Sequence, residues 1–87
     1  MPSGQRISLG DRPVTIGRSS ECTIALSDQN VSRRHAEVRP GPRGYAVADL
    51  GSTNGTMVNG TRIRSEQPLA DGDILSFGAT YIRFEAS

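Results

Sequence analysis

Short stretches of alternating hydrophobic and polar residues recur along the whole chain. The alternation is clearest at residues 14–16, 35–39 and 80–85, where about every second side chain is apolar. A period of two residues is typical of a β-strand with one buried face. No window of 11 residues has the period of about 3.6 that an amphipathic helix requires. The pattern therefore predicts an all-β protein.

Turn residues divide the chain into about ten short strands. Gly, Pro, Asn and Asp allow the backbone conformations of tight turns, and the chain contains 10 glycines. Asn59-Gly60 is the strongest hairpin signal, because a type I′ turn needs positive φ twice, and we assign Asn59 to this turn alone. The expected strands comprise residues 6–9, 14–16, 23–26, 35–39, 45–50, 56–58, 61–63, 74–77 and 80–85. This number of strands predicts an antiparallel β-sandwich, with loops at its two ends.

The direction of successive strands predicts which loops lie together. Consecutive connections of an antiparallel sandwich tend to alternate between its ends, which places residues 17–22 and 51–55 at one end. The turns at residues 10–13 and 40–44 then lie at the other end. Residues 32–34 precede a strand that runs toward the second of these turns, so we expect them beside the first two loops.

Composition limits the classes of protein and function. A chain of 87 residues can form one small domain, and we expect a disordered lead at residues 1–4 followed by a domain at residues 5–87. A net charge of +1 and only four aromatic residues argue against a nucleic-acid-binding domain. The single cysteine, Cys22, excludes an internal disulfide, and without an apolar signal segment we expect a cytoplasmic protein. We expect no metal ion and no cofactor.

Ser32, Arg33 and His35 carry the most suggestive chemistry. A hydroxyl and a guanidinium can both donate hydrogen bonds to an oxyanion, and the planar fork of Arg fits a phosphate with two bonds. Alone, this stretch also fits a solvated basic loop. The predicted loop arrangement adds Arg18 and Asn54 to the same end, which favours a phosphate-binding site.

Two alternatives to simple binding follow from the same residues. An enzyme could use Ser32 as nucleophile and His35 as base, but a third residue must then orient the imidazole, and Glu37 is the only nearby acid. A nucleic-acid phosphate site is disfavoured by the near-zero net charge.

Four motifs in order resemble those of the forkhead-associated (FHA) domain, and most closely the bacterial type. They are Gly17-Arg18, Ser32-x-x-His35, the run from Asp49 to Thr56 with Val58-Asn59-Gly60, and Gly72-Asp73-Ile74. Together they extend over residues 14–84. Typical members begin with one more apolar strand before the hairpin at residues 5–16. We therefore expect either a fragment of a longer protein or an open sheet edge.

The resemblance implies a role for each candidate residue. Arg18 would be the main ion-pair partner of a phosphate, and Ser32 would donate its hydroxyl to a phosphate oxygen. Arg33 would donate its amide and guanidinium, while Arg34 would remain a solvated neighbour. Thr53 would contact the phosphothreonine, and Asn54 would hold the ligand backbone. Structural support of the site would come from Gly17, His35, Gly51 and Gly55.

The implied function is that of a phosphothreonine-peptide binding module in Ser/Thr protein kinase signalling, without catalysis. Its partner would be a phosphorylated protein, either a Ser/Thr kinase or a kinase substrate. Neither nucleic acid nor membrane is an expected partner. We expect a monomer, and the alternative is a dimer formed through the sheet edge. The remaining alternative is a phospho-independent interaction or self-association module that uses the exposed sheet edge.

Overall fold

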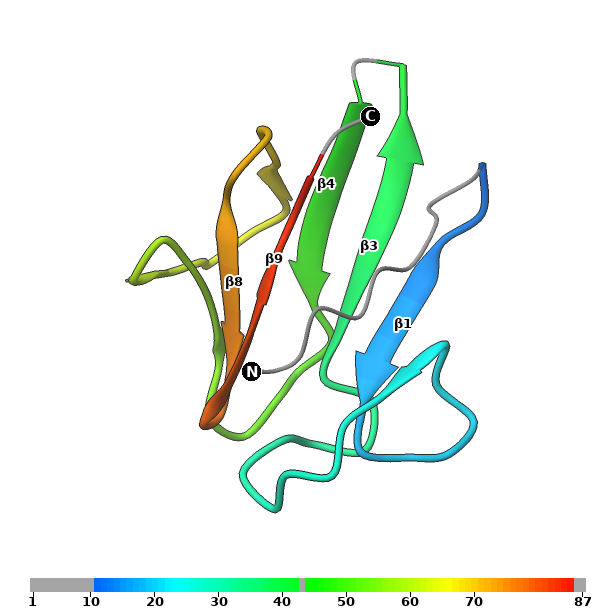
Figure 1. Cartoon of the computed structure of the whole chain (residues 1–87), viewed down its shortest axis with the longest axis vertical. Coiled ribbons are helices and arrows are strands. Elements are labelled where there is room, and N and C mark those ends of the chain that lie inside the picture. The colour runs from blue at the N-terminus through cyan, green and yellow to red at the C-terminus, as the bar shows by residue number, and fades with distance from the viewer. Residues whose placement is uncertain (1–10, 43, 86–87) are drawn as a thin grey trace.

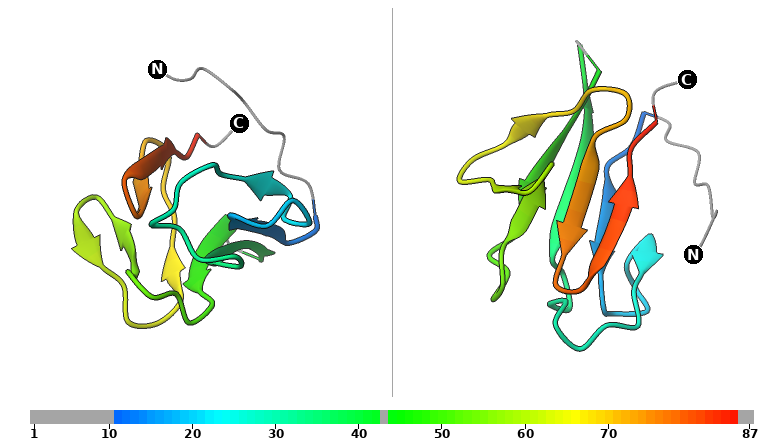
Figure 2. Two further views of the ribbon diagram at one scale, coloured as in Figure 1. Left: turned by 90° about the horizontal axis from the view of Figure 1, so that it is seen from below. Right: turned by 60° about the vertical axis from the view of Figure 1, so that its left-hand side comes forward.

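Two β-sheets packed face to face form the part of the chain that the computed structural model describes, residues 11–42 and 44–85 (Figures 1 and 2). The five-stranded sheet has the order β2-β1-β3-β4-β7, and the four-stranded sheet has the order β6-β5-β8-β9. The strands are β1 (Val14–Gly17), β2 (Ile24–Ala25), β3 (Ala36–Gly41), β4 (Gly44–Asp49), β5 (Thr56–Val58), β6 (Thr61–Arg62), β7 (Gln67–Pro68), β8 (Ile74–Phe77) and β9 (Thr80–Arg83). The predicted all-β sandwich is confirmed. The expected lead at residues 1–4 and strand at residues 6–9 lie outside the described residues.

Alternating side chains of both sheets fill the core, as the sequence pattern predicts. In β3, for example, Ala36 and Val38 are buried, whereas Glu37 and Arg39 lie on the outer face of the sheet. Val31 is an exception because it belongs to a loop, yet its side chain is only 1% exposed and packs in the same core cluster. Burial of Val31 fixes the loop that carries the neighbouring Ser32.

Two features differ from the predicted antiparallel arrangement of strands. Strands β1 and β2 pair in parallel, with Ile16 opposite Ile24. Strand β7 was not expected, and it pairs with Ala46 and Val47 of β4 at the edge of the larger sheet. A two-residue strand shows no alternation, and its Pro68 is tolerated because it lies in an edge strand.

Asn59 does more than form the predicted turn. Its φ of 53° and the φ of 84° at Gly60 agree with the expected Asn-Gly hairpin. Its side-chain amide also donates to Asp73 at 2.9 Å, and its side-chain oxygen accepts the Ile74 N–H at 3.0 Å. The prediction that Asn59 serves the turn alone was wrong, since this residue also joins the β5–β6 hairpin to the start of β8.

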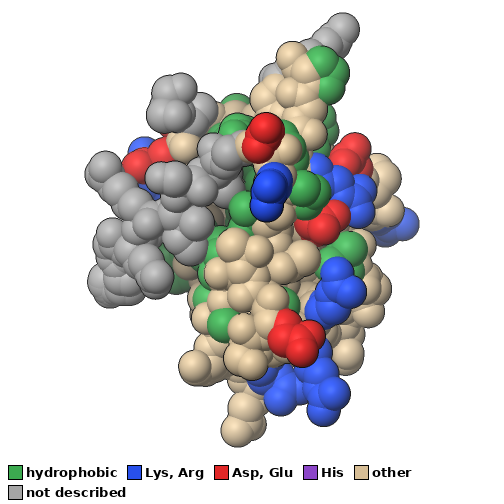
Figure 3. Space-filling model, turned by 90° about the vertical axis from the view of Figure 1, so that its right-hand side faces the viewer, with side chains coloured by type: hydrophobic (Ala, Val, Ile, Leu, Met, Phe, Trp, Pro, Cys, Tyr) green, Lys and Arg blue, Asp and Glu red, His purple; other side chains and the backbone are tan. Residues whose placement is uncertain are grey.

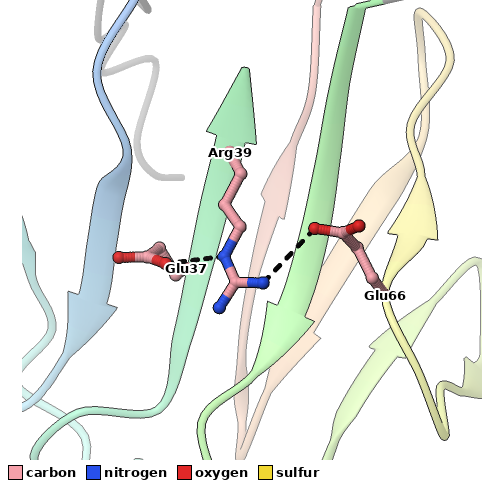
Figure 4. Close-up of polar contacts among 3 residues, drawn as sticks. All are labelled: Glu37, Arg39 and Glu66. Carbon is pink, nitrogen blue, oxygen red and sulfur yellow. Dashed lines mark hydrogen bonds and ion pairs between the residues drawn. The ribbon is translucent and has the colours of Figure 1, made fainter. Parts of the chain in front are cut away.

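An ion-pair network lies on the outer face of the larger sheet (Figure 4). Arg39 donates from Nε to Glu37 at 2.7 Å and from Nη1 to Glu66 at 3.3 Å. The hydrogen bond to Glu37, followed by that to Glu66, raises the pKa of Arg39 above its ordinary value, although desolvation opposes this shift. The network connects β3 to the segment before β7.

The described residues contain no helix that is long and apolar enough to span a membrane.

Candidate functional site

Three loops meet at the lower end of the molecule in Figure 1: loop 18–23 after β1, loop 26–35 before β3, and loop 50–55 after β4. Arg18 N–H donates to the Ser32 carbonyl at 2.9 Å, and Leu50 N–H donates to the His35 carbonyl at 2.9 Å. These backbone bonds confirm the predicted convergence of the loops.

Gly17 allows the first two loops to approach each other. A Cβ atom at this position would lie 2.1 Å from the Arg33 carbonyl oxygen, well inside van der Waals contact. The obstacle is backbone, so it cannot move away like a flexible side chain. Gly17 therefore permits the close packing of these two loops.

Arg18 is exposed, and one hydrogen bond sets its direction. Its Nε donates to the carbonyl of the buried Val31 at 3.1 Å. Within the described residues, its two terminal amino groups have no acceptor and no carboxylate partner. The guanidinium is thus oriented by the protein while most of its donors remain available to a ligand.

Ser32 and Arg33 present further donors beside Arg18. Thr53 N–H donates to Ser32 Oγ at 3.0 Å, which uses the hydroxyl as an acceptor and leaves its hydrogen for another oxygen. The Arg33 carbonyl accepts the Ser19 N–H at 3.1 Å and the Cys22 thiol at 3.1 Å. The Arg33 N–H has no acceptor in the part of the chain that is described. Thr53 is also exposed at this place.

Asn54 lies at one side of these donors, and its amide orientation is fixed. Its Nδ2 donates to the Asn30 carbonyl at 2.7 Å, which leaves Oδ1 and the second amide hydrogen for a ligand. Asn54, Asn30, Gly78 and Ala79 line a shallow pocket of about 260 Å³. Sequence reasoning missed Asn30 because it contributes a backbone carbonyl, which every residue type possesses.

Asp28 holds loop 26–35 against the β8–β9 turn. Its carboxylate accepts the N–H groups of Asn30 and Ala79, and the Thr80 hydroxyl at 2.8 Å. The Asn30 N–H, followed by the Thr80 hydroxyl, lowers the pKa of Asp28 below its ordinary value. The carboxylate therefore fixes the Asn30 carbonyl that orients Asn54.

His35 is completely buried and connects two loops. Its Nδ1 accepts the Ser32 N–H at 3.1 Å, so the ring proton is on Nε2, which donates to the Gly55 carbonyl at 2.7 Å. The ring also packs edge-to-face against Phe77, with centroids 5.4 Å apart. Because backbone groups occupy both nitrogens, the imidazole is not placed as a base for the Ser32 hydroxyl.

The enzyme alternative also lacks the acid that would have to orient His35. Glu37, the acid considered for orienting His35, is paired with Arg39 on the outer face of the sheet. His35 therefore joins loop 26–35 to loop 50–55 through backbone groups.

Asp49 organises loop 50–55. Its carboxylate accepts bonds from the Gly51 and Ser52 N–H groups and from the Ser52 and Thr56 hydroxyls. Burial alone would raise the pKa of Asp49, but the bonds from Ser52, Thr56 and Gly51 outweigh it and lower the pKa. The loop also contains Gly55 with a φ of 85°. Sequence reasoning gave Asp49 and Ser52 no role, although their three-residue spacing is that of a local side-chain cap.

The loop end is rich in unneutralised positive charge. Arg18, Arg33 and Arg34 are exposed, whereas the ion pairs among the described residues involve Arg39 and Arg83. Figure 3 shows basic side chains at this lower end, with an acidic side chain beside them. The described residues contain no group of three or more His, Cys, Asp and Glu side chains that could hold a metal ion. Oriented donors and positive charge together suit an anion with several oxygens.

Comparison with known proteins identifies a family and several relatives that this chain resembles in sequence. Residues 14–78 match the FHA domain family. The chain is 39% identical over 80 residues to the FHA domain-containing protein FhaB of Mycolicibacterium smegmatis, a match that covers 92% of this chain and 52% of FhaB. It is 41% identical over 80 residues to FhaA of Mycobacterium tuberculosis, covering 92% of this chain and 15% of FhaA. The chain thus spans about half the length of FhaB and 15% of the length of FhaA.

Solved structures agree with this result. One comes from a study of phosphothreonine-dependent FHA domain interactions and superposes with a TM-score of 0.91 at 38% identity, covering 99% of this chain and 88% of the other. Another is Mycobacterium tuberculosis EmbR in complex with a low-affinity phosphopeptide, with a TM-score of 0.81 at 37% identity. That match covers 84% of this chain and 19% of EmbR.

Proposed function

Because the chain belongs to the FHA domain family, we propose that it binds phosphothreonine in a partner protein. The domain would act in Ser/Thr protein kinase signalling as a reader of phosphorylation, without catalysing a reaction. Its partner would be a phosphorylated kinase or kinase substrate in the cytoplasm. The structurally similar EmbR was solved with a phosphopeptide, which supports this class of ligand.

The observation that carries the proposal is the hydrogen bond from Thr53 N–H to Ser32 Oγ. Because this bond uses the hydroxyl as an acceptor, its hydrogen is free to be donated to a ligand oxygen. Arg18 and the Arg33 N–H add donors, and the three oxygens of a phosphate are matching acceptors. Thr53 and Asn54 complete the proposed binding residues, supported by Gly17, His35, Gly51 and Gly55.

Loss of the phosphate should remove most of the binding free energy. Two or three charge-assisted hydrogen bonds at about 1.5–3 kcal/mol each would disappear. An Asp or Glu mimic carries less charge and another geometry, so we expect it to bind poorly. Phosphothreonine should bind more tightly than phosphoserine, as the family resemblance implies, because its γ-methyl adds about 1 kcal/mol in an apolar contact.

The test uses one labelled peptide in three forms, with Thr, phosphothreonine or phosphoserine, and measures binding by fluorescence polarisation. We expect the phosphothreonine form to bind at least about 100-fold more tightly than the plain form. Ser32→Ala should remove most of this difference. Ser27→Ala is the matched control, since Ser27 is an exposed serine of the same loop. Equal binding of the plain and phosphothreonine peptides would refute the proposal.

A further inference from the structure

Two arginines outside the proposed phosphate site flank a second pocket. Arg62 lies in β6, and Arg64 follows two residues later in a bend of the chain; both side chains are exposed. With Ile63 they line a shallow pocket of about 340 Å³. Ile63 is half-buried against the core, and its N–H donates to the Thr56 carbonyl at 3.0 Å. The arginines are therefore exposed on a segment that the fold anchors.

Arg62 is in contact with loop 50–55. A Cβ atom on Gly55 would lie 2.6 Å from Arg62 Nε and 2.9 Å from its Cζ, so the guanidinium lies directly against this glycine. Gly55 follows Asn54 and receives the His35 hydrogen bond. In Figures 1 and 2 the β5–β6 hairpin lies on the side of loop 50–55 that faces away from loop 18–23. The Arg62 side chain thus connects the second pocket to loop 50–55.

Neither Arg62 nor Arg64 has a carboxylate partner within residues 11–42 and 44–85. Arg39 and Arg83, by contrast, each pair with glutamate. Two like charges two residues apart repel each other, and an incoming anion would relieve that repulsion. The pocket is therefore suited to a negatively charged group.

The same phosphopeptide can supply that group. Thr53 and Gly55 are two positions apart, which separates them by at most about 7 Å along the backbone. An extended peptide advances about 3.3–3.6 Å per residue, so a side chain roughly two to four residues from the phosphothreonine can reach the arginines. We propose that Arg62 and Arg64 bind an Asp or Glu side chain of the phosphopeptide. This inference rests on the proposed function.

The other pocket beside Asn54 should show no such preference. Its lining residues, Asn30, Asn54, Gly78 and Ala79, carry no charge. A ligand that crosses the phosphate site would therefore meet positive charge on one flank and a neutral surface on the other. An acidic residue should increase affinity on one side of the phosphothreonine only.

The experiment compares three phosphothreonine peptides: one with neutral flanks, one with Glu three residues before the phosphothreonine and one with Glu three residues after it. We expect one acidic peptide to bind the wild type about three- to tenfold more tightly than the neutral peptide, with a gain that shrinks as salt rises. Arg62→Gln/Arg64→Gln should abolish the gain and leave the neutral peptide within about twofold. The single variant Arg64→Gln keeps the Arg62 contact with Gly55. It should lose part of the affinity gain from the acidic peptide.

Arg83→Gln serves as the matched control, because Arg83 is an exposed arginine that already pairs with Glu85. It should retain the whole gain. If neither acidic peptide gains affinity, or if the gain survives in the double variant, the inference is wrong while the proposed function stands. If the neutral phosphothreonine peptide binds no better than its unphosphorylated form, both the function and this inference fail.

Discussion

The arginines of the loop end and those of the outer sheet face are in opposite electrostatic states. Arg39 lies between Glu37 and Glu66, and its charge is neutralised within the protein (Figure 4). Among the described residues, the Arg18 guanidinium is held only by the Val31 carbonyl, which orients it without neutralising it. The same side chain thus stabilises the sheet in one place and remains available to an anion in the other.

Within the described part of the chain, Asp28 and Asp49 leave the arginines of the loop end without an ion-pair partner, although a third acid of these loops, Glu21, is exposed. Asp28 and Asp49 lie in or beside the loops, but their carboxylates accept bonds from backbone N–H groups and hydroxyls. These bonds direct both carboxylates toward the loop backbone, and no arginine pairs with either among the described residues. The lowered pKa of both groups reflects the same bonds.

Removing the charge of Arg18 should have the largest effect. Arg18→Ala should weaken phosphothreonine-peptide binding by about 3–6 kcal/mol, because two charge-assisted hydrogen bonds are lost. The melting temperature should change little, since the side chain is exposed and makes one hydrogen bond. Fluorescence polarisation and thermal unfolding test the two parts. Arg34→Ala is the control, and a loss there as large as for Arg18→Ala would contradict the assignment.

Changing the loop scaffold should have an intermediate effect. Asp49→Asn should lower the free energy of unfolding by about 1–3 kcal/mol at pH 7, because an amide cannot accept all the bonds that the carboxylate receives. Urea denaturation measures this change. Binding should weaken less than in Arg18→Ala, since the phosphate donors themselves remain.

The effect of Asp49→Asn should depend on pH. The folded pKa of Asp49 is lowered, so its stabilising contribution is complete above the unfolded pKa of about 3.9 and is lost as the pH falls through the folded value. The difference in unfolding free energy between wild type and variant should therefore shrink below about pH 4. A difference that stays constant down to pH 2 would exclude the carboxylate as its cause.

Disrupting the paired arginine should have the smallest effect. Arg39→Ala should change the free energy of unfolding by less than about 1 kcal/mol, because the Arg39 and Glu66 side chains are 41% and 50% exposed. Peptide affinity should remain within about twofold of wild type. A fivefold loss of affinity would mean that the sheet face and the loop end are not independent, and that the comparison between them is wrong.

The amino-acid sequence by itself determined the class of fold and most of its strands. Alternation in segments such as residues 14–16 and 35–39 identifies a strand with one buried face, whatever its neighbours are. The Asn59-Gly60 turn was equally predictable, because its backbone conformation favours these two residue types. The direction of the strands then brought residues 18, 32 and 54 to one end.

The tertiary structure alone decided how those residues become a site. The short strand β7 and the parallel pairing of β1 with β2 depend on contacts between parts of the chain that are distant in sequence. The same holds for the hydrogen bond from Asn54 to the Asn30 carbonyl and for the placement of Arg62 against Gly55. Hydrogen bonds from the backbone carry no residue signature. The sequence shows which donors are present, whereas packing determines which of them the protein satisfies internally and which remain for a ligand.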